Sequence, residues 1–207
     1  MDLRTKEVVR YLGYGRCAVD EKTLQEIPRM LEMVERHAIK KSTYHIYTLP
    51  SSAENTIKSK KLKVNLKDCK EVILMAATLG VAIDREIKKY QLVDLAKAVI
   101  LQACATVVLE EYCDELQKDI AAQLRKQGKY MRPRFSPGYG DFSMKHQKDL
   151  LAILDAAKKT GIMMTDSYML TPTKSITAVI GVCDFETNCD LNGCEACKKA
   201  DCIYKRS

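Results

Sequence analysis

A long helical stretch over residues 92–127 constrains the fold of this 207-residue chain more than any other feature. Between residues 98 and 109 nearly every position is apolar, and from Glu110 onward the stretch becomes amphipathic and charged. A helix that is apolar on all sides must be covered on all sides. The sequence therefore predicts a central helix whose apolar part is buried by other elements, and Gly128 is expected to end it.

Several other segments have the patterns of strands or of shorter helices. Strands are predicted at residues 43–49, which alternate, at the apolar run 71–80, and at 162–170 and 175–182, which the turn residues between them should join as a hairpin. Helices are predicted at 5–12, after Asp20, where Pro28 indicates a kink or a late start, at 83–90, and at 145–158 after Ser143. These elements show no repeated βαβ rhythm, so the predicted fold class is α+β.

Charge and hydropathy exclude several classes of protein. The net charge is +7, but the basic residues are scattered and form no continuous basic face with aromatic platforms, so no nucleic-acid partner is expected. No apolar run is long enough to span a membrane, and the first residues have no apolar segment typical of a secretory signal. We therefore expect a cytoplasmic protein without a membrane partner.

The segment Arg134-Phe135-Ser136-Pro137-Gly138-Tyr139-Gly140-Asp141-Phe142 is the clearest candidate for a binding loop. Arginine offers a planar fork suited to a carboxylate or phosphate, and the prolyl-glycyl pair lets the backbone bend close to a ligand. This composition indicates a shaped loop that holds a small anionic ligand. The alternative is a rigid turn between two elements, with a surface arginine.

Nine cysteines are many for a protein of a reducing compartment. The dispersed ones, Cys17, Cys69, Cys104 and Cys113, adjoin apolar residues and are expected to be mostly small buried hydrophobic side chains. The others lie in residues 183–207, a segment without periodicity that we interpret as a Cys-rich tail following a domain of residues 1–182. Four of its thiols are spaced so that they could hold zinc or an iron–sulfur cluster, and the alternative is reduced surface thiols: Cys189, Cys194, Cys197 and Cys202.

Several stretches, in this order, resemble the activation domain of cobalamin (vitamin B12)-dependent methionine synthase, and more closely the free-standing bacterial proteins related to it. They span most of the chain before Cys183: Val9-Arg10-Tyr11-Leu12-Gly13-Tyr14, Leu74-Met75-Ala76-Ala77-Thr78-Leu79-Gly80 with Asp84, Arg134 to Asp141 of the loop, and Met164-Thr165-Asp166-Ser167-Tyr168-Met169-Leu170-Thr171-Pro172 with Lys174-Ser175. The resemblance implies mixed helices around a mainly antiparallel twisted sheet.

The resemblance also implies a function in methionine biosynthesis. Members of the family bind S-adenosylmethionine and dock over the corrinoid of methionine synthase. When the cofactor has been oxidised, a flavodoxin-like or ferredoxin-like donor supplies an electron, and S-adenosylmethionine supplies the methyl group that restores methylcobalamin. The chain is thus expected to be a component of this methyltransferase activity that acts in trans, and cobalamin is expected only through the partner protein.

By the same resemblance, Arg134 should pair with the carboxylate of the ligand, and the backbone of Ser136 and Gly138 should lie against it. Tyr139 corresponds to the aromatic residue of the loop, and Glu111 to a family glutamate near the ligand; for Glu111 the alternative is a solvated carboxylate at a helix end. A competing hypothesis from another class is a redox protein, whose tail holds zinc or an iron–sulfur cluster and which reduces corrinoid proteins directly.

Overall fold

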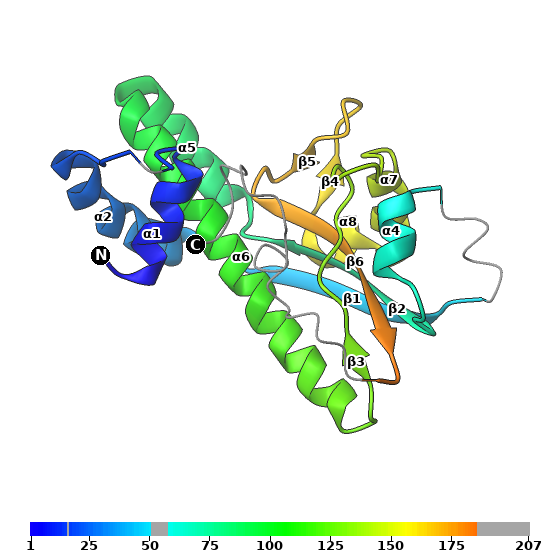
Figure 1. Cartoon of the computed structure of the whole chain (residues 1–207). Coiled ribbons are helices and arrows are strands. Elements are labelled where there is room, and N and C mark those ends of the chain that lie inside the picture. Colours follow the sequence, from blue (N-terminus) through cyan, green and yellow to red (C-terminus); the bar gives the residue numbers. More distant parts are fainter. Residues whose placement is uncertain (16, 51–57, 186–207) are drawn as a thin grey trace.

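The computed structural model describes residues 1–15, 17–50 and 58–185. Within these residues the chain forms a four-stranded antiparallel sheet that lies between two groups of helices (Figure 1). The strands follow the spatial order β1 (Lys41–Thr48), β2 (Glu71–Thr78), β6 (Ser175–Cys183) and β3 (Tyr130–Met131). The expectation of mixed helices around a mainly antiparallel sheet is confirmed.

Strand β2 lies inside the sheet, and both of its faces are buried. Ile73 and Met75 pack into one hydrophobic cluster, whereas Val72 and Leu74 pack into the other. Because successive side chains of a strand point to opposite faces, a strand covered on both sides needs apolar residues at every position. This requirement explains why the apolar run at residues 71–80 identified the strand without alternation.

One group of helices covers the first face of the sheet and is organised by α6. Helix α6 packs against the three other helices of the group. Among its residues Leu101, Cys104 and Val108 are fully buried, so the predicted central helix is confirmed. The group consists of α1 (Leu3–Tyr11), α2 (Glu21–His37), α5 (Val81–Val93) and α6 (Leu95–Arg125).

Aspartates cap three of these helices. The side chains of Asp2, Asp20 and Asp94 each accept a hydrogen bond from the backbone N–H three residues later. Such bonds satisfy donors that the first helical turn leaves without partners. The Asp20 cap is therefore confirmed. Helix α2 begins at Glu21 and continues through Pro28, so the late start does not occur.

The second group of helices covers the other face of the sheet, around Val72, Leu74 and Val179. The predicted helix at 145–158 is divided at Asp155, whose φ of +50° is left-handed and interrupts the helical backbone. This group comprises α4 (Lys60–Asn65), α7 (His146–Leu154), α8 (Ala156–Thr160) and the small hairpin of β4 (Met163–Met164) and β5 (Leu170–Thr171).

The predicted strand at 162–170 is wrong, and so is its predicted hairpin with 175–182. The segment folds back on itself, and β4 pairs with β5 instead. The turn is held at Thr165, whose N–H donates to the carbonyl of Met169 at 2.9 Å and whose Oγ1 accepts from the N–H of Met169 at 3.1 Å. A threonine hydroxyl that bonds nearby backbone competes with the ladder of a longer strand.

In the described part of the chain, no helix has both the length and the apolarity needed to cross a membrane.

Candidate functional site

The candidate loop leaves the sheet next to β6. Phe135 and Val179 form an antiparallel bridge in which each N–H donates to the carbonyl of the other residue at 2.9 Å. Adjacent side chains of extended backbone point to opposite sides. Phe135 accordingly joins the hydrophobic cluster under α7, and Arg134 reaches the other way, to α6.

The guanidinium of Arg134 contacts three acceptors on one face of α6. It lies 2.7 Å from a carboxylate oxygen of Glu110 and 2.7 Å from one of Asp114, and it also donates to Oε1 of Gln117. The spacing i, i+4, i+7 places these acceptors on a single helix face. Burial by itself lowers the pKa of Arg134, but the two carboxylates outweigh it and raise that pKa, so the arginine stays charged.

The turn after Phe135 brings the backbone close to Met144, shortly before α7. Gly138 has a φ of +92°, and its N–H donates to the carbonyl of Phe142 at 2.7 Å. A Cβ at position 138 would lie 2.6 Å from the sulfur of Met144. The left-handed backbone therefore favours glycine here, and a side chain would also have to displace the side chain of Met144.

The aromatic residues of the loop have different environments. Phe135 and Phe142 are buried and lie 6.0 Å apart between ring centroids. Tyr139 is 60% exposed and meets the ring of Phe135 edge-on at 5.3 Å. Ser136 is partly buried, and its carbonyl accepts from the N–H of Tyr139 at 3.1 Å. The two phenylalanines thus anchor the loop, whereas the ring of Tyr139 is available to a ligand or a partner.

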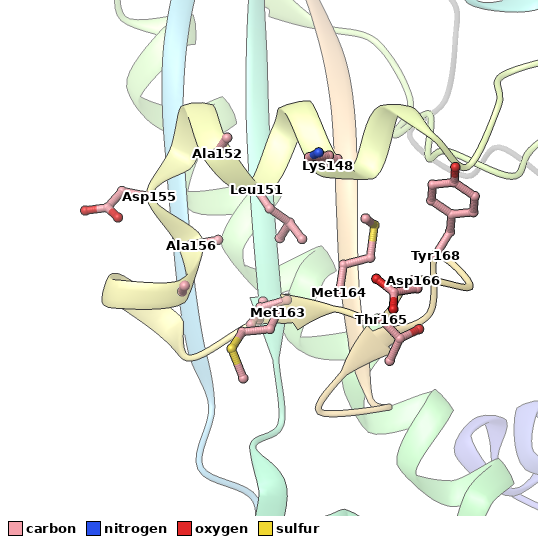
Figure 2. Close-up of a pocket in the computed structure, with 12 residues that line it drawn as sticks. Lys148, Leu151, Ala152, Asp155, Ala156, Met163, Met164, Thr165, Asp166 and Tyr168 are labelled. Atoms are coloured by element: carbon pink, nitrogen blue, oxygen red, sulfur yellow. The ribbon is translucent and has the colours of Figure 1, made fainter.

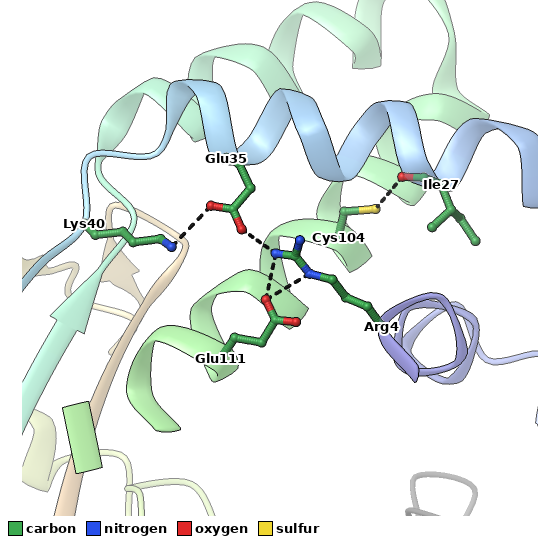
Figure 3. A network of polar contacts seen from close by, with 6 residues as sticks. All are labelled: Arg4, Ile27, Glu35, Lys40, Cys104 and Glu111. Carbon is green, nitrogen blue, oxygen red and sulfur yellow. Dashed lines mark hydrogen bonds and ion pairs between the residues drawn. The ribbon is translucent and has the colours of Figure 1, made fainter. Parts of the chain in front are cut away.

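The predicted site residue Glu111 lies away from Arg134. Its Oε2 accepts from Nε of Arg4 at 3.0 Å, and Arg4 also contacts Glu35 on α2 (Figure 3). Lys40 completes this network with a 3.2 Å contact to Glu35. One residue corresponds to about 100° around a helix. Glu110 therefore faces Arg134 while Glu111 faces α1.

Sequence reasoning missed three side chains that hold Arg134: Glu110, Asp114 and Gln117. A signal for them was present, because polar residues at i, i+4 and i+7 in the charged half of the long helix define one polar face. Which of the adjacent residues Glu110 and Glu111 faces Arg134 depends on the rotation of the helix, which short-range sequence patterns do not fix.

The thiols have varied environments. Cys104 and Cys113 are buried as expected, and burial raises the pKa of each to about 12, whereas Cys69 is partly buried and Cys17 is exposed. Cys183 is buried at the end of β6. Cys189, Cys194, Cys197 and Cys202 lie outside the described residues, so zinc or a cluster there stays a prediction. Within the described ranges no group of three or more His, Cys, Asp or Glu side chains is arranged to hold a metal ion.

The motif Thr165-Asp166-Ser167 lies on the other side of the sheet from the acceptors of Arg134. Thr165 and Asp166 line a cleft of about 530 Å³ between α7–α8 and the β4–β5 hairpin, where the side chains of Leu151 and Met164 also lie (Figure 2). Within the motif, Thr165 closes the turn through its hydrogen bonds with Met169, and its hydroxyl lies 2.9 Å from that of Ser167. The structure therefore does not bring this motif together with Arg134.

Asp141 fastens the loop to α4. Its carboxylate accepts from Ser59 Oγ at 2.6 Å and from the backbone N–H of Lys60 at 2.6 Å. These hydrogen bonds, with that of Ser59 the largest cause, lower the pKa of Asp141 below its ordinary value of 3.8. A carboxyl with a lowered folded-state pKa stabilises the fold above its unfolded pKa, and this stabilisation is lost as the pH falls through the folded pKa.

We therefore expect Asp141→Asn to be less stable than the native protein at neutral pH, with the difference shrinking below about pH 4. Chemical unfolding of both proteins across the acidic range measures it. Asp119→Asn, which changes an exposed carboxylate on α6, is the matched control and should show no such trend. A stability difference that is the same at neutral and acidic pH would contradict the role of this carboxylate.

Comparisons with known proteins identify the family and the fold. The family model described as "Vitamin B12 dependent methionine synthase, activation domain" matches residues 63–184, which is more than half of the chain. A similar solved structure is the "MetH Reactivation Domain bound to AdoHcy", with a TM-score of 0.58, 14% sequence identity and coverage of 86% of this chain and 75% of that one. At that identity the likeness shows the fold. No curated protein matches the chain in sequence. The chain belongs to the family of vitamin B12-dependent methionine synthase activation domains.

Proposed function

We infer that this protein binds S-adenosylmethionine at the loop that begins with Arg134 and acts in trans to support reductive remethylation of the cobalamin of methionine synthase or of a related corrinoid methyltransferase. The observation that carries this function is the charged group on α6. Arg134 is fixed there by Glu110 and Asp114, directly before the glycine turn of the loop.

The charges of this group suit the ligand. S-adenosylmethionine carries a carboxylate, an ammonium and a sulfonium. The carboxylates of Glu110 and Asp114 can attract the two cationic groups, and the charged Arg134 can donate a hydrogen bond to the carboxylate. In the described part of the chain, Arg134 donates through its two terminal nitrogens, and no hydrogen bond occupies its Nε. A donor is therefore left for the ligand.

The backbone of the loop supports the same function. Gly138 has no side chain and is exposed, so the loop presents bare backbone at this position. We expect Ser136 and Gly138 to lie along the ligand and the exposed ring of Tyr139 to cover it. The reactive methyl is activated by its own sulfonium, so the protein needs mainly to hold and aim it.

The methyl acceptor is proposed to be the corrinoid of a partner protein. One electron from a flavodoxin-like or ferredoxin-like donor and one methyl group enter the corrinoid, and S-adenosylhomocysteine leaves. The chain is then a component of methionine synthase activity. A net charge of +7 favours encounter with an acidic partner.

Calorimetric titration with S-adenosylmethionine tests the ligand. We expect the native protein to bind it and Arg134→Ala to bind it at least about tenfold more weakly, because a hydrogen bond to a charged group is lost. Arg36→Ala removes an exposed ion pair with Glu32 on α2 and should bind like the native protein.

Circular dichroism must show that Arg134→Ala is folded, and Arg134→Lys, which keeps the charge but loses the fork, should fall between the two. If the native protein does not bind S-adenosylmethionine at all, the ligand assignment is wrong. The alternative redox function of the Cys-rich tail would then become the leading hypothesis.

Replacing Glu110 or Glu111 by glutamine tests which of the two residues contributes to ligand binding. Glu110→Gln removes a negative charge beside Arg134 and should weaken binding by about tenfold. Glu111→Gln should leave affinity nearly unchanged and lower stability, because Arg4 loses an ionic partner. The opposite result in the same titrations would restore Glu111, as predicted from the sequence, as the residue near the ligand.

Remethylation in trans can be measured with a methionine synthase that lacks its own activation domain and holds oxidised cobalamin. With methyl-labelled S-adenosylmethionine and reduced flavodoxin, label should enter the corrinoid only when this protein is present. Arg134→Ala should transfer little label at the same ligand concentration. Equal transfer with and without the protein would refute the function in trans, even if the ligand binds.

A further inference from the structure

A partly buried amine, that of Lys174, lies next to α6 at the beginning of β6. Its Nζ donates to Oγ1 of Thr106 at 3.0 Å, and that hydroxyl donates in turn to the carbonyl of Gln102 at 3.0 Å. The carboxylate of Asp84 is used by the neighbouring Thr173, through the backbone N–H at 2.9 Å and the hydroxyl at 2.5 Å. Across the described residues, no carboxylate lies within ion-pair distance of the Lys174 amine.

This environment leaves the amine with unused hydrogen-bonding capacity. An ammonium has three donors, and a single hydroxyl accepts from this one. Burial lowers the pKa of Lys174, with only a partial opposing effect from the charge of Asp84. Arg134, by contrast, has two carboxylate partners. A desolvated cation that only a neutral group contacts is a candidate for binding an additional oxygen.

Helix α6 relates this amine to the group around Arg134. Thr106, Glu110 and Asp114 follow one another at intervals of four residues and so lie on the same face of the helix. One turn rises about 5.4 Å, so the partner of Lys174 lies about one turn before the first partner of Arg134. The two cations therefore contact neighbouring positions of one polar stripe.

The strand pairing also places Arg134 and Lys174 at different points along the site, in the same order as along α6. Phe135 pairs antiparallel with Val179. The loop from Arg134 to Gly138 therefore runs opposite to β6, towards the end of the strand where Ser175 lies. Lys174 is the residue directly before this strand. The Gly138 end of the loop and the amine of Lys174 therefore lie towards the same end of the site, and Arg134 marks the other.

We propose that Lys174 binds the ribose hydroxyl oxygens of S-adenosylmethionine, at the opposite end of the site from Arg134. This inference rests on the proposed function. A ligand whose carboxylate lies at Arg134 and whose body follows the backbone of Ser136 and Gly138 extends its adenosyl group towards Lys174. Ribose hydroxyls are neutral acceptors, as is the Thr106 hydroxyl that the amine contacts in this structure.

Titration of S-adenosylhomocysteine and of its 2′-deoxy and 3′-deoxy analogues tests the proposal on the native protein and on Lys174→Met. The native protein should lose about tenfold or more in affinity for at least one deoxy analogue, as expected for a hydrogen bond to a charged group. Lys174→Met should lose a similar factor for the parent ligand. For the same analogue it should show almost no further loss, because the two changes remove one interaction.

The matched control is Lys97→Met, because the Lys97 amine contacts Glu26 on α2, away from the polar stripe. It should bind all three ligands like the native protein. Thr106→Val gives a second variant if Lys174→Met does not fold. It removes the hydroxyl that orients the amine and should weaken the parent ligand more than the deoxy analogue.

Equal affinity of the native protein for the parent ligand and for both deoxy analogues would overturn the proposal. An unchanged affinity of Lys174→Met for the parent ligand would also overturn it. So would a loss for the variant with the deoxy analogue that equals the product of the two separate losses. In each of these cases the native protein still binds the parent ligand, so the proposed function stands. Absence of binding of both S-adenosylmethionine and S-adenosylhomocysteine to the native protein would refute the function, and the role of Lys174 with it.

Discussion

Burial of α6 is the constraint on which the rest of the structure depends. Its apolar half packs against α1, α2 and α5 and lies over one face of the sheet, so residues such as Leu101 and Val108 are fully removed from water. Burial of each such side chain contributes roughly 1.5–3 kcal/mol. From Glu110 onward the helix is amphipathic: Cys113, Ile120 and Leu124 stay in the same core, and another face carries polar side chains. The polar face that results is fixed in position by the apolar half that precedes it.

The ion pairs of Arg134 make use of this rigidity. Loops are usually less well ordered than the elements they join, and a binding loop needs a fixed point on a scaffold. Here Glu110 and Asp114 supply one fixed point on α6, and Asp141 supplies a second at α4 on the opposite side of the sheet. The loop therefore spans the end of the sheet between two helical layers and is held at both of its ends.

Elements of the structure could be predicted from the sequence where the pattern that defines them is local. The buried helix and strand β2 were predictable, because complete burial leaves an apolar run that needs no knowledge of neighbours. The turn at Thr165 was missed, because the side-chain and backbone hydrogen bonds of one threonine hold a strand-like segment as a hairpin. Glu111 was matched to a family glutamate near the ligand, and that role stays a prediction. In the structure Glu110 contacts Arg134, whereas Glu111, about 100° further around the helix, contacts Arg4. The loop itself was recognised from its composition, but its acceptors on α6 come from a distant part of the chain.

Pro137 explains why the loop leaves β6 where it does. The bridge between Phe135 and Val179 places Pro137 at the next position that would pair in an antiparallel ladder, and proline has no N–H to donate. In the described structure the backbone accordingly makes no ladder bond beyond this bridge, and the turn at Gly138 closes instead on Phe142. The edge of β6 between Val179 and Ser175 is thus not continued by a paired strand. The loop therefore separates from the sheet at this point, between Arg134 on the side of α6 and Asp141 on the side of α4.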